Sequence, residues 1–261
     1  MIKKYKNLKF VIKEGIARII LDNPTTYNAL SMETIDSLLK IFKFLNNDKK
    51  SKIIIIEGNG AGFSAGHNLK EIQSLKNKLA YKKLFNHCSK LMLQIINHRK
   101  PIIAKVHGAA FAAGCQLVAS CDLAYSTSDA IFATPGVNIG LFCSTPMVAL
   151  SRKVARKKSM KMLLTGESIS ASYAKEIGLI NDFFDPKKLE DEVLKVAKVI
   201  SSKSNLVLSF GKSSFYKQLE LPIDKAYKYT CEIMVQNMMT EDAKEGINAF
   251  IEKRNPIWKN K

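Results

Sequence analysis

The stretch HGAAFAAGCQLVASCDLAYSTSDAIFATPGVNIGLFCSTP, residues 107–146, decides both the fold and the site that this sequence predicts. Its small residues form a turn that opens a helix, and the first turn of a helix offers free backbone N–H groups to an oxyanion. KPIIAKV, which ends at residue 106, predicts a buried strand directly before that turn. Strand, small-residue loop and helix also follow one another earlier, where Ile53–Ile56 precede the glycine-rich loop 58–68 and a helical stretch over 80–98. This order predicts a mixed α/β fold.

The flanking segments extend this prediction to the whole chain. VIKEGIARIIL alternates apolar and polar residues around a Lys-Glu-Gly turn, which predicts a hairpin from Leu8 to Leu21. METIDSLLKIFKFLNN has apolar residues at helical spacing, with Ser31 before it as the cap. From Pro186 to Lys253 the periodicity is helical almost throughout. We therefore expect residues 1–185 to form an α/β core that carries the site and residues 186–261 to form a helical region continuous with it.

The composition limits the classes of partner. The formal net charge of +18 comes from 41 lysine and arginine residues against 23 aspartate and glutamate residues. This excess raises nucleic-acid binding as an alternative, but the lysines are scattered, aromatic residues do not alternate with them, and arginine is scarce. We therefore favour a solvated surface that attracts polyanionic small molecules over a nucleic-acid interface.

Other classes are disfavoured by what the sequence lacks. No apolar run approaches the roughly 18 residues that span a bilayer, and the first residues lack the apolar core of a secretion signal. The five cysteines show neither CxxC spacing nor histidines at zinc-like intervals, which predicts no disulfide framework and no metal site. We expect a chain without a membrane partner that is not secreted, in a bacterial cytoplasm or in the matrix of a mitochondrion or another organelle.

Six motifs in one order resemble the crotonase superfamily, the enoyl-CoA hydratases and isomerases, nearly from end to end. Within it, the wording of GHNLKEI, AAGCQLVASCD and ATPGVNIGLFCSTP is most similar to the branch called enoyl-CoA hydratase domain-containing protein 3. The six motifs are NPTTYNAL (23–30), FSAGHNLKEI (63–72), KPIIAKVHGAAFAAGCQLVASCDLAYS (100–126), FATPGVNIGL (132–141), LTGESISA (164–171) and EGINAFIEKR (245–254).

The resemblance implies a fold, an assembly and a ligand. The fold is a crotonase-like spiral of strand-strand-helix turns with a C-terminal helical region, assembled as a homotrimer or a dimer of trimers. The ligand is an acyl- or enoyl-coenzyme A thioester, handled by a lyase or isomerase of fatty acid metabolism, with no permanently bound cofactor. An enolate forms when such a thioester loses its α-proton or is attacked at the β-carbon, and two preorganised N–H donors stabilise the negative oxygen.

Alignment with the family assigns these donors to the backbone amides of His67 and Ala113. The His67 side chain has two interpretations: a loop histidine that faces solvent, or a ring that reaches the acyl pocket and exchanges protons. For coenzyme A, the resemblance places the backbone around Ala65, His67 and Leu69 at the adenine and Lys70 near the phosphates. It adds Lys253 from the C-terminal helix, across a subunit boundary, with a solvated helix face as the alternative.

This sequence departs from the family where proton transfer is expected. Hydration needs a base and an acid, and the family's hydratases use two glutamates about twenty positions apart. Here these positions hold Gln116 and Gly136, and Thr25 and Thr26 stand where relatives carry a basic residue for phosphate. An amide is neither a useful acid nor a useful base at neutral pH and glycine has no side chain, so two-glutamate hydration is disfavoured.

Cys143 and Ser144 lie on the loop expected to face the acyl end, but a nucleophile there would need an activating base, and ordinary packing is the alternative. Three functions therefore remain open. The first is an enzyme that stabilises a thioester enolate, with Gln116 orienting the reactant. The second is a non-catalytic acyl-CoA-binding protein, and the third, less favoured, is an RNA-binding relative of the hydratases.

Overall fold

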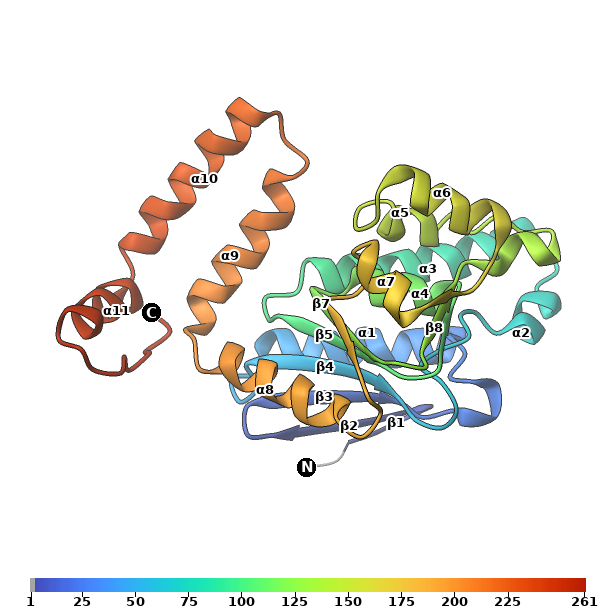
Figure 1. Ribbon diagram of the computed structural model, residues 1–261, viewed down its shortest axis with the longest axis horizontal. Helices are drawn as coiled ribbons and strands as arrows, with labels where there is room; N and C mark the ends of the chain where they lie inside the picture. Colours follow the sequence, from blue (N-terminus) through green and yellow to red (C-terminus); the bar gives the residue numbers. More distant parts are fainter. Residues whose placement is uncertain (1–2) are drawn as a thin grey trace.

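The computed structural model describes residues 3–261 (Figure 1). Within them, the larger sheet has seven strands in the order β1-β2-β3-β4-β5-β7-β10, antiparallel from β1 to β3 and parallel from β3 onward. The strands are β1 (Lys3–Tyr5), β2 (Leu8–Lys13), β3 (Ile16–Leu21), β4 (Ile53–Gly58), β5 (Ile102–Val106), β7 (Leu123–Thr127) and β10 (Asp182–Phe184).

The hairpin predicted from Leu8 to Leu21 is confirmed. β2 and β3 pair in register from Leu8 opposite Leu21 to Lys13 opposite Ile16. Glu14 and Gly15 connect them, both with positive φ angles of 51° and 78°. A two-residue turn of this kind matches the right-handed twist of the strands that it joins.

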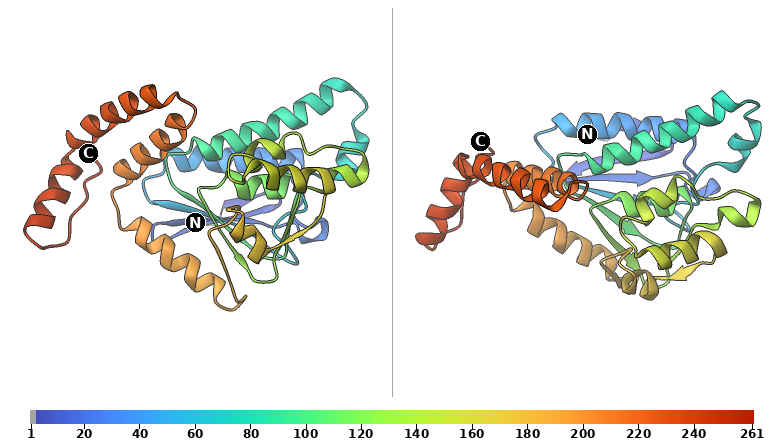
Figure 2. Two further views of the ribbon diagram at one scale, coloured as in Figure 1. Left: turned by 45° about the horizontal axis from the view of Figure 1, so that its top comes forward. Right: turned by 90° about the horizontal axis from the view of Figure 1, so that it is seen from above.

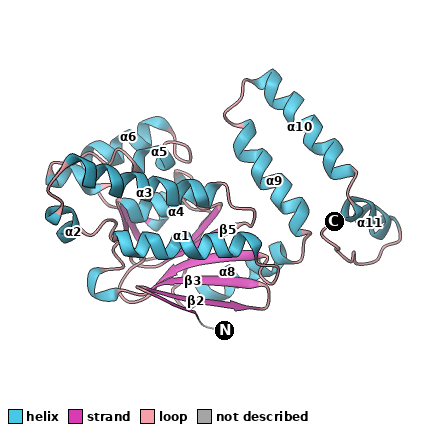
Figure 3. Ribbon diagram, turned by 180° about the vertical axis from the view of Figure 1, so that it is seen from behind, coloured by secondary structure: helices cyan, strands magenta, loops and turns pink. Residues whose placement is uncertain are grey.

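The sheet is covered on both faces, as its four-isoleucine strand requires. Successive side chains of β4 point to opposite faces, so Ile54 and Ile56 join the larger core under α1 and α3, whereas Ile53 and Ile55 join a smaller core under α8. Figure 3 shows α1 across the strands with α3 beside it. The bounds are α1 (Met32–Asn47), α3 (Lys78–Ile96) and α8 (Leu189–Ser201).

A small second sheet and several short helices form the part of the molecule that carries the predicted site. β6 pairs parallel with β8, and β8 pairs antiparallel with β9. The elements are η1 (Pro24–Thr26), α2 (Leu69–Ser74), β6 (Ala109–Phe111), α4 (Ala113–Ser120), β8 (Ile131–Ala133), η2 (Pro135–Ile139), α5 (Pro146–Leu150), α6 (Arg156–Thr165), β9 (Ile169–Ser170) and α7 (Ala171–Glu176).

The predicted boundary at residue 185 does not coincide with the change in packing. Leu189, Val193 and Ala197 of α8 are buried against the sheet, so α8 belongs to the core. The chain leaves the core only afterwards, where α9 and α10 form a helical pair that leads to α11 at the far end (Figures 1 and 2). These helices are α9 (Asn205–Gln218), α10 (Ile223–Met238) and α11 (Glu241–Ile251).

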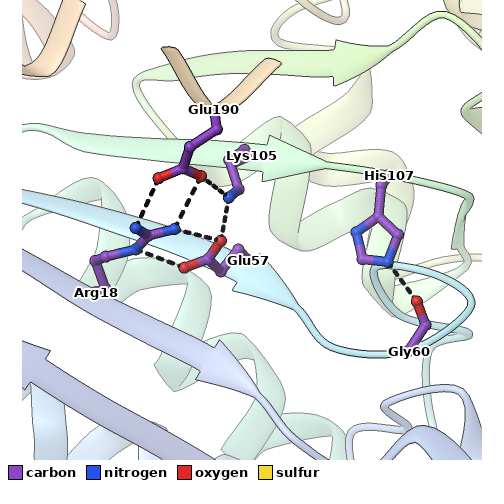
Figure 4. A network of polar contacts seen from close by, with 6 residues as sticks. All are labelled: Arg18, Glu57, Gly60, Lys105, His107 and Glu190. Carbon is purple, nitrogen blue, oxygen red and sulfur yellow. Dashed lines mark hydrogen bonds and ion pairs between the residues drawn. The ribbon is translucent and has the colours of Figure 1, made fainter. Parts of the chain in front are cut away.

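Four charged side chains fasten α8 to three neighbouring strands (Figure 4). Arg18 of β3 binds Glu57 of β4 at 2.7 Å and Glu190 of α8 at 2.7 Å. Lys105 of β5 contacts the same two carboxylates. Because each cation lies between two anions, this charge quartet is internally neutralised.

Candidate functional site

The glycine-rich loop 58–68 is joined to β6 and to the start of α4. Ser64 N–H donates to Ala109 O at 3.1 Å, and Phe111 N–H donates to Ser64 O at 2.9 Å. His107 Nε2 lies 2.8 Å from Gly60 O at the other end of the loop (Figure 4). These contacts bring together the two segments to which the sequence assigned the oxyanion-binding amides.

Gly66 is the point of closest approach between the two segments. A Cβ on this residue would lie 3.0 Å from Ala113 N and 2.9 Å from Phe111 O, and its φ of 88° also favours glycine. The amide of His67 follows Gly66 directly in the chain. The two predicted donors therefore stand on adjacent backbone segments.

Neither predicted donor is used by the protein itself. Within residues 3–261, the backbone N–H groups of His67 and Ala113 have no protein acceptor. Ala113 is the first residue of α4, where an N–H has no partner inside the helix. Both groups are consequently free to donate to a ligand.

Ala112 sets the direction of one of these donors. Its φ of 48° and ψ of −114° are exceptional for a residue with a side chain, and ψ of residue 112 orients the peptide that carries the Ala113 N–H. The conformation is held on both sides, because Ala112 N–H donates to Ala133 O and Ala112 O accepts from Gln116 N–H, each at 2.9 Å. Strain of this kind, maintained by its surroundings, is typical of functional sites.

The His67 side chain is turned inward, so its interpretation as a solvent-facing residue is wrong. Nδ1 lies 3.1 Å from Leu30 O, and because a carbonyl only accepts, Nδ1 carries the hydrogen. The ring meets Phe85 of α3 edge to face. Burial lowers the pKa of His67, and Nε2 is enclosed without a partner among the described residues. The imidazole is therefore neutral; its role in proton exchange stays a prediction.

The Gln116 side chain is buried and hydrogen-bonded within the protein. The side chain is 3% exposed, and its Nε2 donates to Thr145 O at 3.1 Å. Its Oε1 lies 4.0 Å from the thiol of Cys88 on α3. The amide thus links α3, the first turns of α4 and the residue that precedes α5.

Gly136 does not leave an empty space where a carboxylate would stand. A Cβ here would lie 2.4 Å from Leu141 O and 2.9 Å from Cys143 Sγ. The turn is closed by Leu141 N–H, which donates to Gly136 O at 2.9 Å. The Leu141 carbonyl and the Cys143 side chain take the space that a Cβ would need, so inserting a glutamate would displace backbone.

The polar side chains considered as nucleophiles lack activation. Burial raises the pKa of Cys143 and raises that of Cys115 to about 12, so both are neutral thiols at physiological pH. Ser144 is exposed, and its hydroxyl donates to Phe142 O at 3.3 Å. Within the described residues, none of the three has a hydrogen bond to a histidine or carboxylate, which favours packing over nucleophilic catalysis.

The positions expected to bind coenzyme A are brought together in part. Ala65, Leu69 and Lys70 are exposed on the loop and on the first turn of α2. Lys253 follows the end of α11, which lies at the opposite end of the molecule from α2 (Figures 1 and 2). One chain alone therefore does not bring Lys253 to the others.

Asn28, a residue that was not singled out from the sequence, holds the neighbouring loops in place. Its Nδ2 donates to Asn59 O and Gly62 O, each at 2.8 Å, and its Oδ1 accepts from Asn23 N–H. The adjacent carbonyl of Tyr27 accepts from Ala65 N–H. Asn28 has a positive φ of 55°, a conformation that asparagine tolerates better than most residues. An asparagine in the loop motif NPTTYNAL is therefore the sequence signal that could have pointed to it.

Asp122 has a structural role. It accepts hydrogen bonds from Ile102 N–H, from Lys212 Nζ at 2.7 Å and from Tyr216 OH at 2.9 Å, and so holds α9. A cavity of about 360 Å³ lies beside this contact, away from the predicted site; it is lined by Pro101, Asp122, Lys153, Leu208, Gly211, Lys212, Phe215 and Tyr216.

Residues 3–261 were also considered for a metal-binding cluster and for a membrane-spanning helix. No group of three or more histidine, cysteine, aspartate or glutamate side chains in this range is arranged to hold a metal ion. Each helix in the same range is too short or too polar to cross a bilayer.

Comparison with known proteins agrees with this architecture. A family model described as enoyl-CoA hydratase/isomerase matches residues 11–261. The chain is 47% identical over 246 residues to enoyl-CoA hydratase domain-containing protein 3, mitochondrial, of Mus musculus, covering 94% of this chain and 82% of that protein. It is 31% identical over 255 residues to crotonyl-CoA hydratase of Syntrophomonas wolfei, covering 96% of each.

Solved structures give the same result. Human enoyl Coenzyme A hydratase domain-containing protein 3 matches with a TM-score of 0.94 at 44% identity, over 97% of this chain and 100% of that chain. An enoyl-CoA hydratase of Mycobacterium smegmatis matches with a TM-score of 0.95 at 44% identity, over 97% and 98% of the two chains. The predicted fold class, family and branch resemblance are confirmed.

Proposed function

The chain belongs to the enoyl-CoA hydratase/isomerase family, and from this premise we propose that it binds an acyl- or enoyl-CoA thioester and stabilises the enolate. The amides of His67 and Ala113 form the oxyanion hole. A donor of this kind contributes roughly 3 kcal/mol to a transition state when it is preorganised. The free N–H groups on the two adjoining segments carry the proposal.

Ordinary hydration by two glutamates is not part of this function. The Gln116 amide is neither an acid nor a base at neutral pH, and its hydrogen bond to Thr145 O holds it in place. Gly136 is enclosed by its own loop. Proton transfer to and from the α-carbon then falls to water, to the substrate or to the neutral His67 ring.

We assign coenzyme A recognition to Ala65, Leu69 and Lys70 of one subunit and Lys253 of another. Lysine provides a point charge for phosphate. A homotrimer or dimer of trimers would bring the distant Lys253 to the site and would cover the apolar side chains that α9–α11 expose. Among these are Phe215, Ile223, Met239, Phe250 and Ile251, each at least 53% exposed. Relatives named mitochondrial support an organelle matrix, with a bacterial cytoplasm as the alternative.

A non-catalytic acyl-CoA-binding protein is the second candidate. It is favoured by the same two positions, since Gln116 and Gly136 both serve the packing of the loop that follows β8. In this case the oxyanion-binding amides would hold the ground-state carbonyl only. RNA binding is disfavoured, because the lysines are scattered, aromatic residues do not alternate with them and arginine is scarce.

Thermal melting with butyryl-CoA, free coenzyme A and RNA tests the ligand. A ligand at a hundredfold excess over its Kd stabilises the native state by about 2.7 kcal/mol, so butyryl-CoA should raise the Tm. If RNA raises it and no ester does, the proposal fails. Crotonyl-CoA hydration, followed by loss of the conjugated thioester absorbance, should stay far below that of ordinary hydratases; a comparable rate would refute the interpretation of Gln116 and Gly136.

Exchange of the α-protons of butyryl-CoA in D2O separates catalysis from binding. An enzyme that forms the enolate incorporates deuterium, whereas a binding protein shifts the Tm without incorporation. Replacing the Ala113 residue by its α-hydroxy-acid analogue turns this N–H into an ester oxygen, which removes one donor without a ring that would clash with Gly66 or restrict Ala112, and should lower exchange by about 10²–10³-fold. The same ester at Arg156, the first residue of α6, is the matched control and should leave exchange unchanged.

A further inference from the structure

The two positions that lack the hydratase glutamates lie at the base of one loop. This loop, residues 136–146, runs from Gly136 of η2 to the first residue of α5 and contains Cys143 and Thr145. Gly136 begins the loop and Gln116 of α4 contacts it, although the two positions are twenty apart in the sequence. Glutamine at 116 and glycine at 136 therefore affect the structure of the same loop, in addition to removing two carboxylates.

The hydrogen bonds of this loop show how it is closed. Leu141 N–H returns to Gly136 O at 2.9 Å, and Met147 N–H of α5 donates to Cys143 O at 2.9 Å. The Cys143 side chain packs against Gly136, with Sγ 2.9 Å from the position that a Cβ would take. Gln116 supplies the side-chain contact from α4, through Nε2 to Thr145 O at 3.1 Å.

We infer that Gln116 is a positioning residue that locks loop 136–146 against the first turns of α4, beside the Ala113 amide. An amide suits this position because Thr145 O is an acceptor and needs a donor. The hydrogen bond and the burial of the side chain together hold Gln116 in one orientation. A carboxylate of the same shape would place an acceptor against an acceptor. Gly136 completes the arrangement, since the closed loop leaves no room for a Cβ.

This lock adds a role in acyl binding to the proposed function. That ligand-dependent role rests on the proposed function, whereas the lock itself does not. With the loop fixed, the acyl end of the site has a preorganised neutral wall in place of two carboxylates. Preorganisation lowers the cost of ordering the site when a ligand binds. We therefore expect Gln116 to matter for the acyl group and to leave the recognition of the coenzyme A moiety unchanged.

Hydrogen–deuterium exchange of the ligand-free protein tests the lock directly. In Gln116→Glu, the amides of residues 137–145 should exchange at least about tenfold faster than in the wild type at pH 8. Protonation of the introduced carboxylate restores a donor for Thr145 O, so the closed loop raises the pKa of this carboxyl group. The protection lost at pH 8 should therefore return at pH 5, after correction for intrinsic rates. Gln116→Met should show the faster exchange at both pH values, because it cannot titrate.

Gln236→Glu on exposed α10 is the matched charge control and should leave the loop unchanged. Wild-type exchange of residues 137–145 in Gln116→Met, or a pH-independent effect in a folded Gln116→Glu, overturns the inference. If Gln116→Glu fails to fold, Gln116→Met decides alone.

The affinity for butyryl-CoA relative to free coenzyme A provides the ligand-dependent measurement. Gln116→Met should lower this ratio by about tenfold with unchanged affinity for free coenzyme A. An unchanged ratio refutes the role in acyl binding. If the wild type binds neither compound, the proposed function fails, and the exchange result still decides whether the lock exists.

Discussion

Replacing Ala112 by glycine tests the strained backbone at the start of α4. Ala112 has a φ of 48° and a ψ of −114°, a combination that glycine adopts without steric conflict. A residue with a side chain held in such a region costs about 1–3 kcal/mol. Glycine should relieve this cost and increase the free energy of unfolding.

The unfolded chain reduces the gain. Glycine adds backbone freedom to the unfolded state, which costs about 0.4–1 kcal/mol for an alanine-to-glycine change. The difference leaves a net stabilisation of about 1 kcal/mol, which corresponds to a Tm increase of about 2–4 °C for a chain of this size. Both hydrogen bonds of the residue are made by its backbone, so the substitution preserves them.

Urea unfolding and thermal melting of Ala112→Gly measure this effect. Ala155→Gly is the matched control, because Ala155 is exposed and has an ordinary φ of −53°; it should be destabilised by about 0.4–1 kcal/mol. If both variants lose stability equally, Ala112 is not strained and the reasoning is refuted. The gain in stability should be accompanied by weaker binding of butyryl-CoA, since glycine frees the peptide that carries the Ala113 N–H.

Three further substitutions address the rest of the molecule. Gly136→Ala should lower the free energy of unfolding by about 1–3 kcal/mol through overpacking, whereas Gly211→Ala in α9, where a Cβ meets nothing, should raise it by about 0.5–1 kcal/mol; urea titration compares them. Asp122→Ala should cost about 3 kcal/mol by leaving the buried Lys212 without its carboxylate, and proteolysis should then cut α9 faster. Burial lowers the pKa of His98 to about 4, so stability should fall as the pH drops from about 6.5 to 4, because only the unfolded chain binds this proton there; His98→Gln should flatten that dependence, and an unchanged pH profile would contradict it.

Local patterns were sufficient to predict the regular elements. The helix Met32–Asn47 and its cap follow from apolar spacing and one serine, and Ser31 Oγ does accept from Thr34 N–H at 3.2 Å. The small sheet of β6, β8 and β9 was not predicted, because strands of two or three residues are too short to show a period. Its pairing depends on contacts between distant segments.

The sequence suggested the members of the proposed site but not their surroundings. The positions of His67, Gln116 and Gly136 came from alignment, whereas the partner of Gln116 is a backbone carbonyl 29 residues away. No pattern in the sequence predicts that hydrogen bond or the position of the Leu141 carbonyl beside Gly136. Such contacts arise only when separate loops meet, and they decide whether a missing carboxylate can be restored.

The charge quartet has a consequence for how relatives of this protein diverge. Loss of the carboxylate at Glu57 would leave Arg18 and Lys105 facing each other with only Glu190 between them. A single substitution therefore unbalances three neighbours at once, while a simultaneous exchange of a cation and an anion for apolar residues does not. These four sites should be inherited as a unit, and homologous chains should hold either the complete set or a paired replacement.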